Sequence, residues 1–294
     1  MFSIIGIVVV FGAIVAGYLM EKGNLMVLVQ PAELLIIGGA AAGTVLIANP
    51  PYVLKQIAKG ITGVFGGSKF TKQRYLDSLK MLYDLFNRSR REGLTAIEAD
   101  IEDPSKSKTF TAYPGVVKDH HVLSFICDTL RTASSGAVDP FDIDQMMEHD
   151  MEVHHHGALA PISSLTTVAD ALPGLGIVAA VLGVVITMGA IGGPPEEVGK
   201  KVAAALVGTF LGILLCYGLV GPLASKMSKS AEEHHEFFQV LRVLILSFLK
   251  GNAPIIAIEM ARRAIPAHVR PSFDEMEKQC KGGAPGAPSD VEAA

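Results

Sequence analysis

The chain has 294 residues, 50% of them hydrophobic and 18% charged, with a mean hydropathy of +0.40. Because soluble domains carry about 25% charged residues, this composition excludes an ordinary soluble protein. The formal net charge is −4, and we expect no nucleic-acid partner. Three cysteines, Cys127, Cys216 and Cys280, are too few and too scattered for a disulfide framework or a metal site.

Four uncharged stretches are each long enough to cross a bilayer, since about 20 helical residues span a hydrocarbon core of about 30 Å. The first lacks the basic start and the cleavage site of a secretory signal, so we expect it to be retained. More than a hundred residues of soluble composition separate the second stretch from the third. The four stretches are Met1–Met20, Leu34–Leu54, Ala171–Pro195 and Val202–Ser225.

Basic residues indicate the orientation of these spans. All Lys and Arg residues except Lys22, Lys200 and Lys201 lie within Lys55–Arg131 or after Ser225. Because basic residues gather on the cytoplasmic side, the central domain and both termini are predicted to face the cytoplasm of a cell bounded by an inner membrane.

Apolar residues at helical spacing predict soluble helices over Thr71–Arg91, Val116–Ser134, Asp139–His156 and Ser225–Lys250, and no strand pattern occurs. The predicted fold is all-α: a polytopic membrane protein with four transmembrane helices and a helical cytoplasmic domain. Its parts are transmembrane helices over 1–20, 30–50, 166–193 and 201–224, a cytoplasmic helical domain over 51–165, C-terminal cytoplasmic helices over 225–280 and a flexible tail over 281–294.

Small residues line one face of each of the last two spans. The first face carries Gly176, Ala180, Gly183 and Thr187, and the second carries Ala205, Thr209, Gly212 and Cys216. Such seams let helices approach closely in lipid, and the threonine hydroxyls favour a partner or water.

The spans lack an ionisable residue at depth, where ion-conducting proteins usually have one. Glu33 is expected at the outer end of span 2 and Asp170 at the cytoplasmic end of span 3. If ions cross this protein, another chain must therefore supply the carboxylate.

Two prolines interrupt the last two spans. Pro173 and Pro222 each remove a backbone hydrogen bond, so both helices should kink, at what we expect to be the same depth. These prolines are either hinges that pass a change to the cytoplasmic helices or residues that a membrane helix merely tolerates.

Several motifs in order resemble the flagellar motor stator family MotA over nearly the whole chain. They are Ala171–Pro173, Gly176–Gly183, Gly221–Ala224, Arg88–Leu94 followed by Glu98 and Asp100–Pro104, and Arg270–Phe273. The resemblance implies a pentamer around a dimer of a MotB-type peptidoglycan-anchored subunit, which brings the missing aspartate. It also implies that ion flow past this aspartate drives the stator against the rotor protein FliG.

The resemblance also implies roles for single residues. Arg90 and Glu98 match the rotor contact, although Arg88 or Arg91 can share the role of Arg90. Pro173 and Pro222 match the coupling prolines, while Ala180, Thr209, Thr187 and Asp170 would line the ion pathway. Sodium-driven relatives carry threonine where this chain has Ala180, so we expect protons, since losing an oxygen ligand weakens sodium coordination.

Other readings are weaker. The histidines His154–His156 have poor geometry for one metal ion, because adjacent helical residues point about 100° apart. An enzyme or metal transporter would need ionisable residues within the spans, and no catalytic or nucleotide motif occurs. We therefore expect no enzyme, cofactor or metal. The alternative is a proton-driven energiser of the ExbB/TolQ type, which typically has three spans and lacks the loop carrying Arg90 and Glu98.

Overall fold

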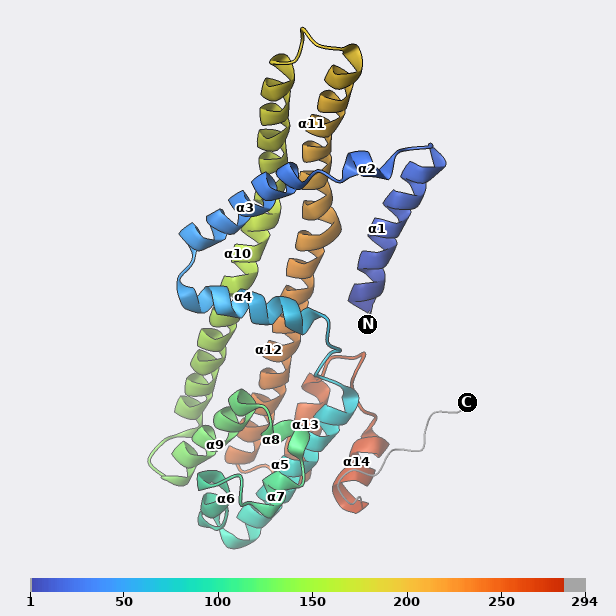
Figure 1. Ribbon diagram of the computed structural model, residues 1–294. Helices are drawn as coiled ribbons and strands as arrows, with labels where there is room; N and C mark the ends of the chain where they lie inside the picture. Colours follow the sequence, from blue (N-terminus) through green and yellow to red (C-terminus); the bar gives the residue numbers. More distant parts are fainter. Residues whose placement is uncertain (1, 283–294) are drawn as a thin grey trace. The chain divides into compact units, whose positions relative to one another are not determined.

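The computed structural model describes residues 2–282, which are largely helical and contain no strand (Figure 1). The chain divides into two compact units, each made from two stretches of sequence. Unit 1 comprises Met1–Gly67 with His156–Ala231, and unit 2 comprises Ser68–His155 with Glu232–Ala294. Helices α10 (Pro140–Met188) and α12 (Gly221–Leu249) contribute residues to both units.

Unit 1 holds the apolar helices. Four helical stretches are long and apolar enough to cross a membrane: Phe2–Met20, Leu25–Ala48, Pro140–Met188 and Pro195–Leu249. This agrees with the four predicted spans. The helices that belong wholly to unit 1 are α1 (Phe2–Met20), α2 (Leu25–Leu28), α3 (Pro31–Ala48), α4 (Pro51–Val64) and α11 (Pro195–Leu215), followed by a π-helical segment, η2 (Cys216–Val220).

Prolines set the starts of three of these helices. Pro31, Pro51 and Pro195 each occupy the first helical position, where the missing N–H has no helical partner in any case. Helix α1 is apolar on all sides and buries none of its residues within the chain. Such a helix is suited to lipid or to a neighbouring subunit.

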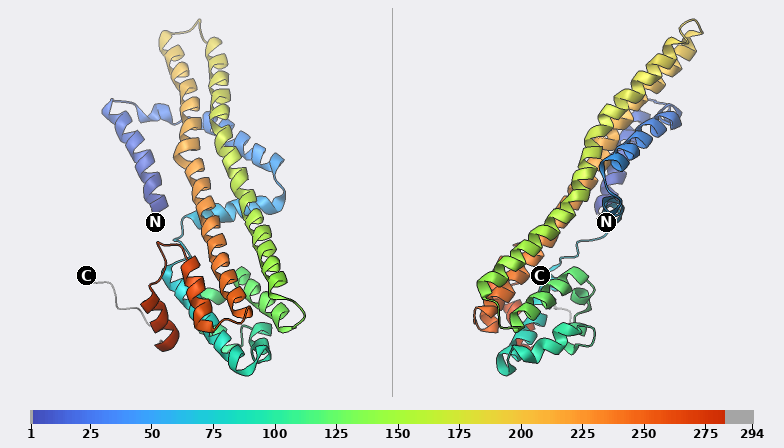
Figure 2. Two further views of the ribbon diagram at one scale, coloured as in Figure 1. Left: turned by 180° about the vertical axis from the view of Figure 1, so that it is seen from behind. Right: turned by 90° about the vertical axis from the view of Figure 1, so that its left-hand side faces the viewer.

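The second predicted span and the residues after it form two separate helices. Helix α3 ends at Ala48, and α4 starts at Pro51 after the extended residues Asn49 and Pro50. Helix α4 is amphipathic, and it was not predicted as a helix. It buries Val53 and Ile57 within unit 1, while its lysines are exposed. In Figures 1 and 2, α3 crosses the paired helices α10 and α11, whereas α4 crosses α10 and the start of α12.

Unit 2 has its own hydrophobic core. Helices α5 and α9, the end of α12 and the C-terminal helices surround it, and Phe86 stacks on Phe248 with ring centroids 4.0 Å apart. The elements wholly within unit 2 are α5 (Lys72–Glu92), the 3-10 helix η1 (Leu94–Ile97), α6 (Glu98–Glu102), α7 (Lys108–Thr111), α8 (Pro114–Val117), α9 (His120–Ser134), α13 (Pro254–Ala264) and α14 (Phe273–Gly282).

The predicted soluble helices are present with shifted ends. The helix expected over Thr71–Arg91 is α5, capped by the Thr71 side chain. The helix expected over Val116–Ser134 is divided into α8 and α9. Asp139 caps α10, because its carboxylate accepts a hydrogen bond from the Phe141 N–H at 2.8 Å. The tail expected over 281–294 starts two residues too early, since α14 extends to Gly282, and the rest lies outside the described residues.

Candidate functional site

The predicted rotor-contact residues flank a sharp turn in unit 2. Helix α5 ends at Glu92 and is capped by Gly93, which has φ of 90° and donates its N–H to the Ser89 carbonyl at 2.8 Å. A positive φ favours glycine, so this residue allows the chain to turn. Arg90 lies before the turn and Glu98 after it. Both side chains are exposed, and within residues 2–282 neither forms an ion pair or a side-chain hydrogen bond.

A pair of charges beneath this turn holds its two sides together. The Arg88 guanidinium donates to the Ala96 carbonyl at 2.6 Å and pairs with the carboxylate of Asp100, which is buried. Ile97, next to Glu98, is fully buried in the core of unit 2. The ion pair and the buried isoleucine together leave Glu98 facing outward.

This arrangement bears on which arginine is available for a partner. Arg88 already has its guanidinium engaged by Asp100 and Ala96, whereas Arg90 and Arg91 are exposed. The basic residues in the last turn of α5 also suit the negative end of the helix dipole. Of the three arginines considered from the sequence, Arg90 and Arg91 form no ion pair or side-chain hydrogen bond within residues 2–282, whereas Arg88 is held by Asp100 and Ala96.

Helices α10 and α11 of unit 1 pack along the predicted seam of small residues. A Cβ atom added to Gly212 would lie 2.6 Å from the Leu172 carbonyl oxygen and 2.9 Å from Cα of Gly176. One added to Gly183 would lie 2.7 Å from Cβ of Ala205. The glycines thus permit backbone contact between the two helices.

The four predicted ion-pathway residues lie in different surroundings. Thr187 is buried, and its hydroxyl donates to the Gly183 carbonyl at 2.8 Å. Ala180 and Thr209 are half-buried beside the seam, and the backbone N of Ala180 would lie 3.2 Å from a Cβ added to Gly208. Asp170 is exposed in the isolated chain. Ala180 and Thr209 thus lie on adjoining parts of the two helices.

The two coupling prolines do not lie at the same level, contrary to expectation. The residue before Pro173, Leu172, contacts Gly212 of α11. Pro222 instead precedes Leu223, which belongs to the apolar cluster that contains Ile162 of α10. At 1.5 Å per residue, the ten residues from 162 to 172 separate these levels by about 15 Å.

A third proline lies closer to the level of Pro222. Pro161 is buried within α10, next to Ile162, and sequence reasoning did not single it out. Helix α10 continues through Pro161 and Pro173 as α-helix, whereas the π-helical segment η2 precedes Pro222. A π segment before a proline accommodates the clash of the ring with the preceding turn. The predicted distortion at Pro222 is thus present in this form.

The surroundings of Glu33 were not predicted from the sequence. Its side chain, in the first turn of α3, is buried against Gly208 of α11 and Gly183 of α10. Its place at the end of this helix was expected, but its burial against two other apolar helices was not. Sequence spacing carries no signal for this contact, because Glu33 belongs to a different helix, α3.

The histidines of α10 pack against other histidines. His154 lies between His121 of α9 and His234 of α12, with ring centroids 4.8 and 4.9 Å away, and His155 lies 4.7 Å from His235. Among the described residues no group of His, Cys, Asp and Glu is arranged to hold a metal ion. These rings therefore contribute to aromatic packing within unit 2.

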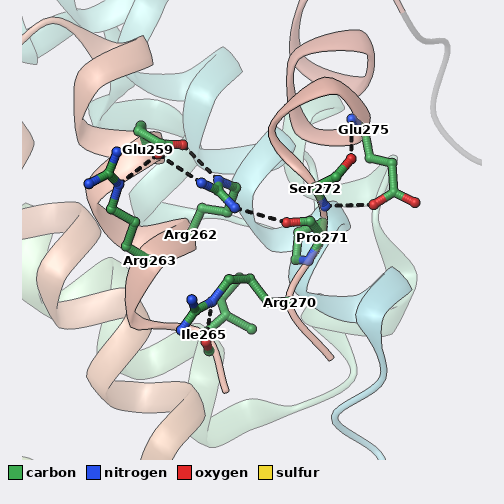
Figure 3. A network of polar contacts seen from close by, with 8 residues as sticks. All are labelled: Glu259, Arg262, Arg263, Ile265, Arg270, Pro271, Ser272 and Glu275. Carbon is green, nitrogen blue, oxygen red and sulfur yellow. Dashed lines mark hydrogen bonds and ion pairs between the residues drawn. The ribbon is translucent and has the colours of Figure 1, made fainter. Parts of the chain in front are cut away.

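The motif Arg270–Phe273 links α13 to α14 through a polar network (Figure 3). Ser272 and Glu275 form a capping box: the Ser272 N–H donates to the Glu275 carboxylate at 2.7 Å, and the Glu275 N–H donates to the Ser272 hydroxyl at 3.1 Å. Arg262 donates to the Pro271 carbonyl at 3.1 Å, and Arg270 donates to the Ile265 carbonyl at 2.8 Å. These contacts explain the motif as a structural joint.

Known proteins resemble this chain over nearly its full length. The model of the motility protein A N-terminal region matches residues 4–93, and that of the MotA/TolQ/ExbB proton channel family matches residues 118–239. Motility protein A of Salmonella typhimurium is 42% identical over 281 residues, which cover 96% of this chain and 95% of that protein. This chain belongs to the motility protein A family.

Other members and solved structures agree. The chemotaxis protein LafT of Vibrio parahaemolyticus is 36% identical over 93% of this chain and 96% of its own length. The flagellar MotAB stator complex from Bacillus subtilis has a chain that matches with a TM-score of 0.72 and 26% identity, covering 93% of this chain and 97% of that one. The C. jejuni MotAB structure matches in fold with a TM-score of 0.76, 19% identity and coverage of 92% and 98%. Within the MotA family, this chain is accordingly an integral membrane stator protein.

Proposed function

We propose that this chain is an ion-conducting stator subunit of the bacterial flagellar motor, which couples proton flow across the inner membrane to torque on the rotor. The observation that carries this function is the near full-length similarity to motility protein A. The four apolar spans support it, and so do the exposed charges Arg90 and Glu98, which form no ion pair among the described residues. A stator needs both a membrane part and a surface that meets another protein.

The partners follow from the family and from uncovered apolar surface. Helix α1 buries none of its residues, and Val181 and Ile186 of α10 are 55% and 64% exposed. Such surface is suited to lipid or to other subunits. The proposed assembly is five copies of this chain around two copies of a MotB-type subunit anchored in peptidoglycan, which brings an aspartate to the ion pathway.

The rotor contact is assigned to Arg90 and Glu98, and the rotor protein is proposed to be FliG. Charged pairs that form and break repeatedly must be weak and screened, as exposed charges are. The opposite charges of Arg90 and Glu98, on the two sides of the Gly93 turn, would determine the alignment of the rotor protein on this surface more than its affinity. Both termini are proposed to lie in the cytoplasm, because most Lys and Arg residues belong to the soluble stretches and basic residues gather on the cytoplasmic side of a membrane.

Coupling is proposed to pass through Pro173 and Pro222, with Pro161 now part of the same system. Pro173 and the residues of α10 beside Leu223 lie at different levels along α10. The prolines are therefore proposed to act one after another along α10 and α12, and not as two hinges at one depth. Ala180 is proposed to select protons, with Thr187 and Thr209 lining the pathway and Asp170 at its cytoplasmic end.

The test is motility of a stator-null bacterium that expresses this chain with its cognate MotB-type partner. Swimming that requires the partner, stops with a protonophore and ignores external sodium is the expected result. Dependence on sodium would overturn the role of Ala180 but keep the stator function.

A charge reversal tests the rotor contact in the same strain. Arg90→Glu should abolish most swimming without lowering the amount of protein in the membrane, because Arg90 has no partner within the described chain. The matched control is Arg131→Glu, on an exposed arginine of α9 whose partners among the described residues are Asp128 in the same helix and the Ile101 carbonyl of α6. No rescue by the unaltered chain, despite a compatible rotor, would favour an ExbB/TolQ-type energiser.

A further inference from the structure

The carboxyl group of Glu33 occupies a recess formed by two glycines. Glu33 is the sole ionisable residue of α3 and is 7% exposed. A Cβ atom added to Gly208 would lie 2.6 Å from its Oε2, and one added to Gly183 would lie 3.6 Å from its Oε1. Any larger residue at position 208 would therefore displace the carboxyl group.

This recess supplies no counter-charge. Oε2 has no hydrogen-bond partner within the described chain. The stretch Ala171–Met188 of α10 and the stretch Val202–Leu215 of α11 contain no charged residue and no histidine, and neither does α2. The nearest ionisable side chains along these elements are Asp170, Lys201 and the thiol of Cys216 in η2. Lys201 lies seven residues, about 10 Å of helix, before Gly208.

An isolated carboxylate in such surroundings is costly, because it is buried and no charged side chain of the surrounding helices offsets its charge. Binding one proton removes that cost and makes the group a hydrogen-bond donor. The Glu33 side chain is thus suited to hold a proton in the arrangement seen here, and to release it when water or an acceptor reaches the recess.

The recess adjoins the residues assigned to the ion pathway. Gly208 directly precedes Thr209, and its added Cβ would also lie 3.2 Å from the backbone N of Ala180. The carbonyl of Gly183 accepts the hydroxyl of Thr187 at 2.8 Å. Both glycines that contact Glu33 are therefore neighbours of pathway residues, although Glu33 itself comes from another helix.

We propose that Glu33 is a proton-binding site of the ion pathway, carried by this chain in addition to the carboxylate that the partner brings. The carboxylate takes up one proton and passes the same proton to the next acceptor, so the step leaves Glu33 unchanged over a cycle. The proposal rests on the proposed stator function for its role in torque, but the protonation of Glu33 can be tested without it.

Infrared difference spectroscopy tests the protonation directly. The complete complex of this chain and its MotB-type partner is placed in lipid nanodiscs, and the spectrum of the Glu33→Gln complex is subtracted from that of the unaltered complex. A carbonyl band of a protonated carboxylic acid, shifted in deuterated water, is the expected result. Only the antisymmetric band of an ionised carboxylate in the difference spectrum would show Glu33 to be charged and would overturn the proposal.

The role in torque is tested in the stator-null strain. Glu33→Gln keeps the shape of the side chain but cannot bind and release a proton, so it should assemble and lose most of its torque, while Glu33→Asp should retain part of it. Equal torque for Glu33→Gln and the unaltered chain across external pH would overturn the pathway role. If the unaltered chain fails to swim, the stator function fails, whereas the infrared band still decides the proton site.

A glycine substitution tests the position of the carboxyl group. Gly208→Ala places its Cβ against Oε2, so the acid band should shift and torque should fall. Gly43→Ala on α3 is the matched control, because nothing lies within 4 Å of its added Cβ. An unshifted band in Gly208→Ala would show that Glu33 does not occupy this recess.

Discussion

At the scale of single residues, the positions of the exposed charges Arg90 and Glu98 depend on Arg88, which forms an ion pair with Asp100. Arg88 joins the end of α5 to Ala96 and Asp100, on either side of Glu98. Breaking a pair that includes a buried carboxylate leaves that carboxylate without its partner. We therefore expect the Arg88–Asp100 ion pair to maintain the distance between the side chains of Arg90 and Glu98.

Replacing Arg88 should therefore do two things that replacing Arg90 does not. Arg88→Ala should lower the stability of unit 2 by about 1–3 kcal/mol, the usual cost of an unsatisfied buried group, and should also reduce torque. Arg90→Ala should reduce torque alone. Thermal unfolding of the purified chains, alongside swimming speed, separates the two effects. An Arg88→Ala chain of unaltered stability would contradict the positioning role.

The sequence predicted features that depend on local pattern, but it did not predict contacts between residues far apart in the chain. The small-residue seam follows from helical periodicity, whereas the roles of Arg90 and Glu98 were implied by the resemblance to the MotA family and remain predictions. The pairing of Arg88 with Asp100 depends on the path of the chain through η1, and the burial of Glu33 depends on how α3 crosses two distant helices. Neither contact leaves a periodic signal in the sequence.

The stability of the polar network around Glu259 in α13 should decrease in acid. Hydrogen bonds from Arg262, opposed by burial and aided by Arg263, lower the pKa of Glu259 from 4.5 to about 2. Because the folded pKa lies below the unfolded one, this carboxylate stabilises the fold above about pH 4.5. That contribution decreases as the pH falls toward 2.

Hydrogen exchange in α13, corrected for the intrinsic rate at each pH, measures this dependence. Protection should decrease between pH 4.5 and 2 in the unaltered chain. Glu259→Gln should show less protection at neutral pH and a weaker change over that interval. Identical pH profiles for the two chains would contradict the role of the carboxylate.

At the scale of elements, helices α10 and α11 pack closely through their glycines, and the irregular π-helical segment η2 follows this contact. Gly176, Gly183 and Gly212 bring the backbones into contact, and η2 follows directly after α11. The seam was predicted from spacing, but Gly208 was not, because it lies between the periodic positions. The π segment was also beyond prediction, since only the proline at 222 indicated an irregularity.

Enlarging the seam should separate these helices. Gly212→Ala places a Cβ 2.6 Å from the Leu172 carbonyl oxygen, and overpacking of this kind typically costs about 1–3 kcal/mol. Gly174→Ala is the control, because nothing lies within 4 Å of its added Cβ. Thermal aggregation of the detergent-solubilised chains should occur at a lower temperature for Gly212→Ala alone. Equal temperatures would show that the seam tolerates a methyl group.

At the scale of the whole molecule, each unit is assembled from separated stretches. Hydropathy predicted the apolar helices well, because a bilayer requires continuous apolar runs. It did not predict that the core of unit 2 is closed by Phe237, Leu241 and Leu244 of α12 together with residues of α13. Long-range packing of this kind follows from topology rather than from local pattern.

The segment 68–155 should consequently not fold alone. Without the buried residues of α12 and α13, its apolar face is left open to water. Circular dichroism of the isolated segment should show a non-cooperative thermal transition, and adding a peptide of residues 232–282 should restore a cooperative one. A cooperative transition without that peptide would show that α5 to α9 form an independent core.

The glycine at 208 has a consequence for how related chains vary. A side chain at that position and a carboxyl group reaching from position 33 compete for one space. Substitutions at the two positions should therefore be correlated across species. Lineages with alanine or serine at the position of Gly208 should carry a shorter or uncharged residue at the position of Glu33, and lineages that keep the acid should keep the glycine.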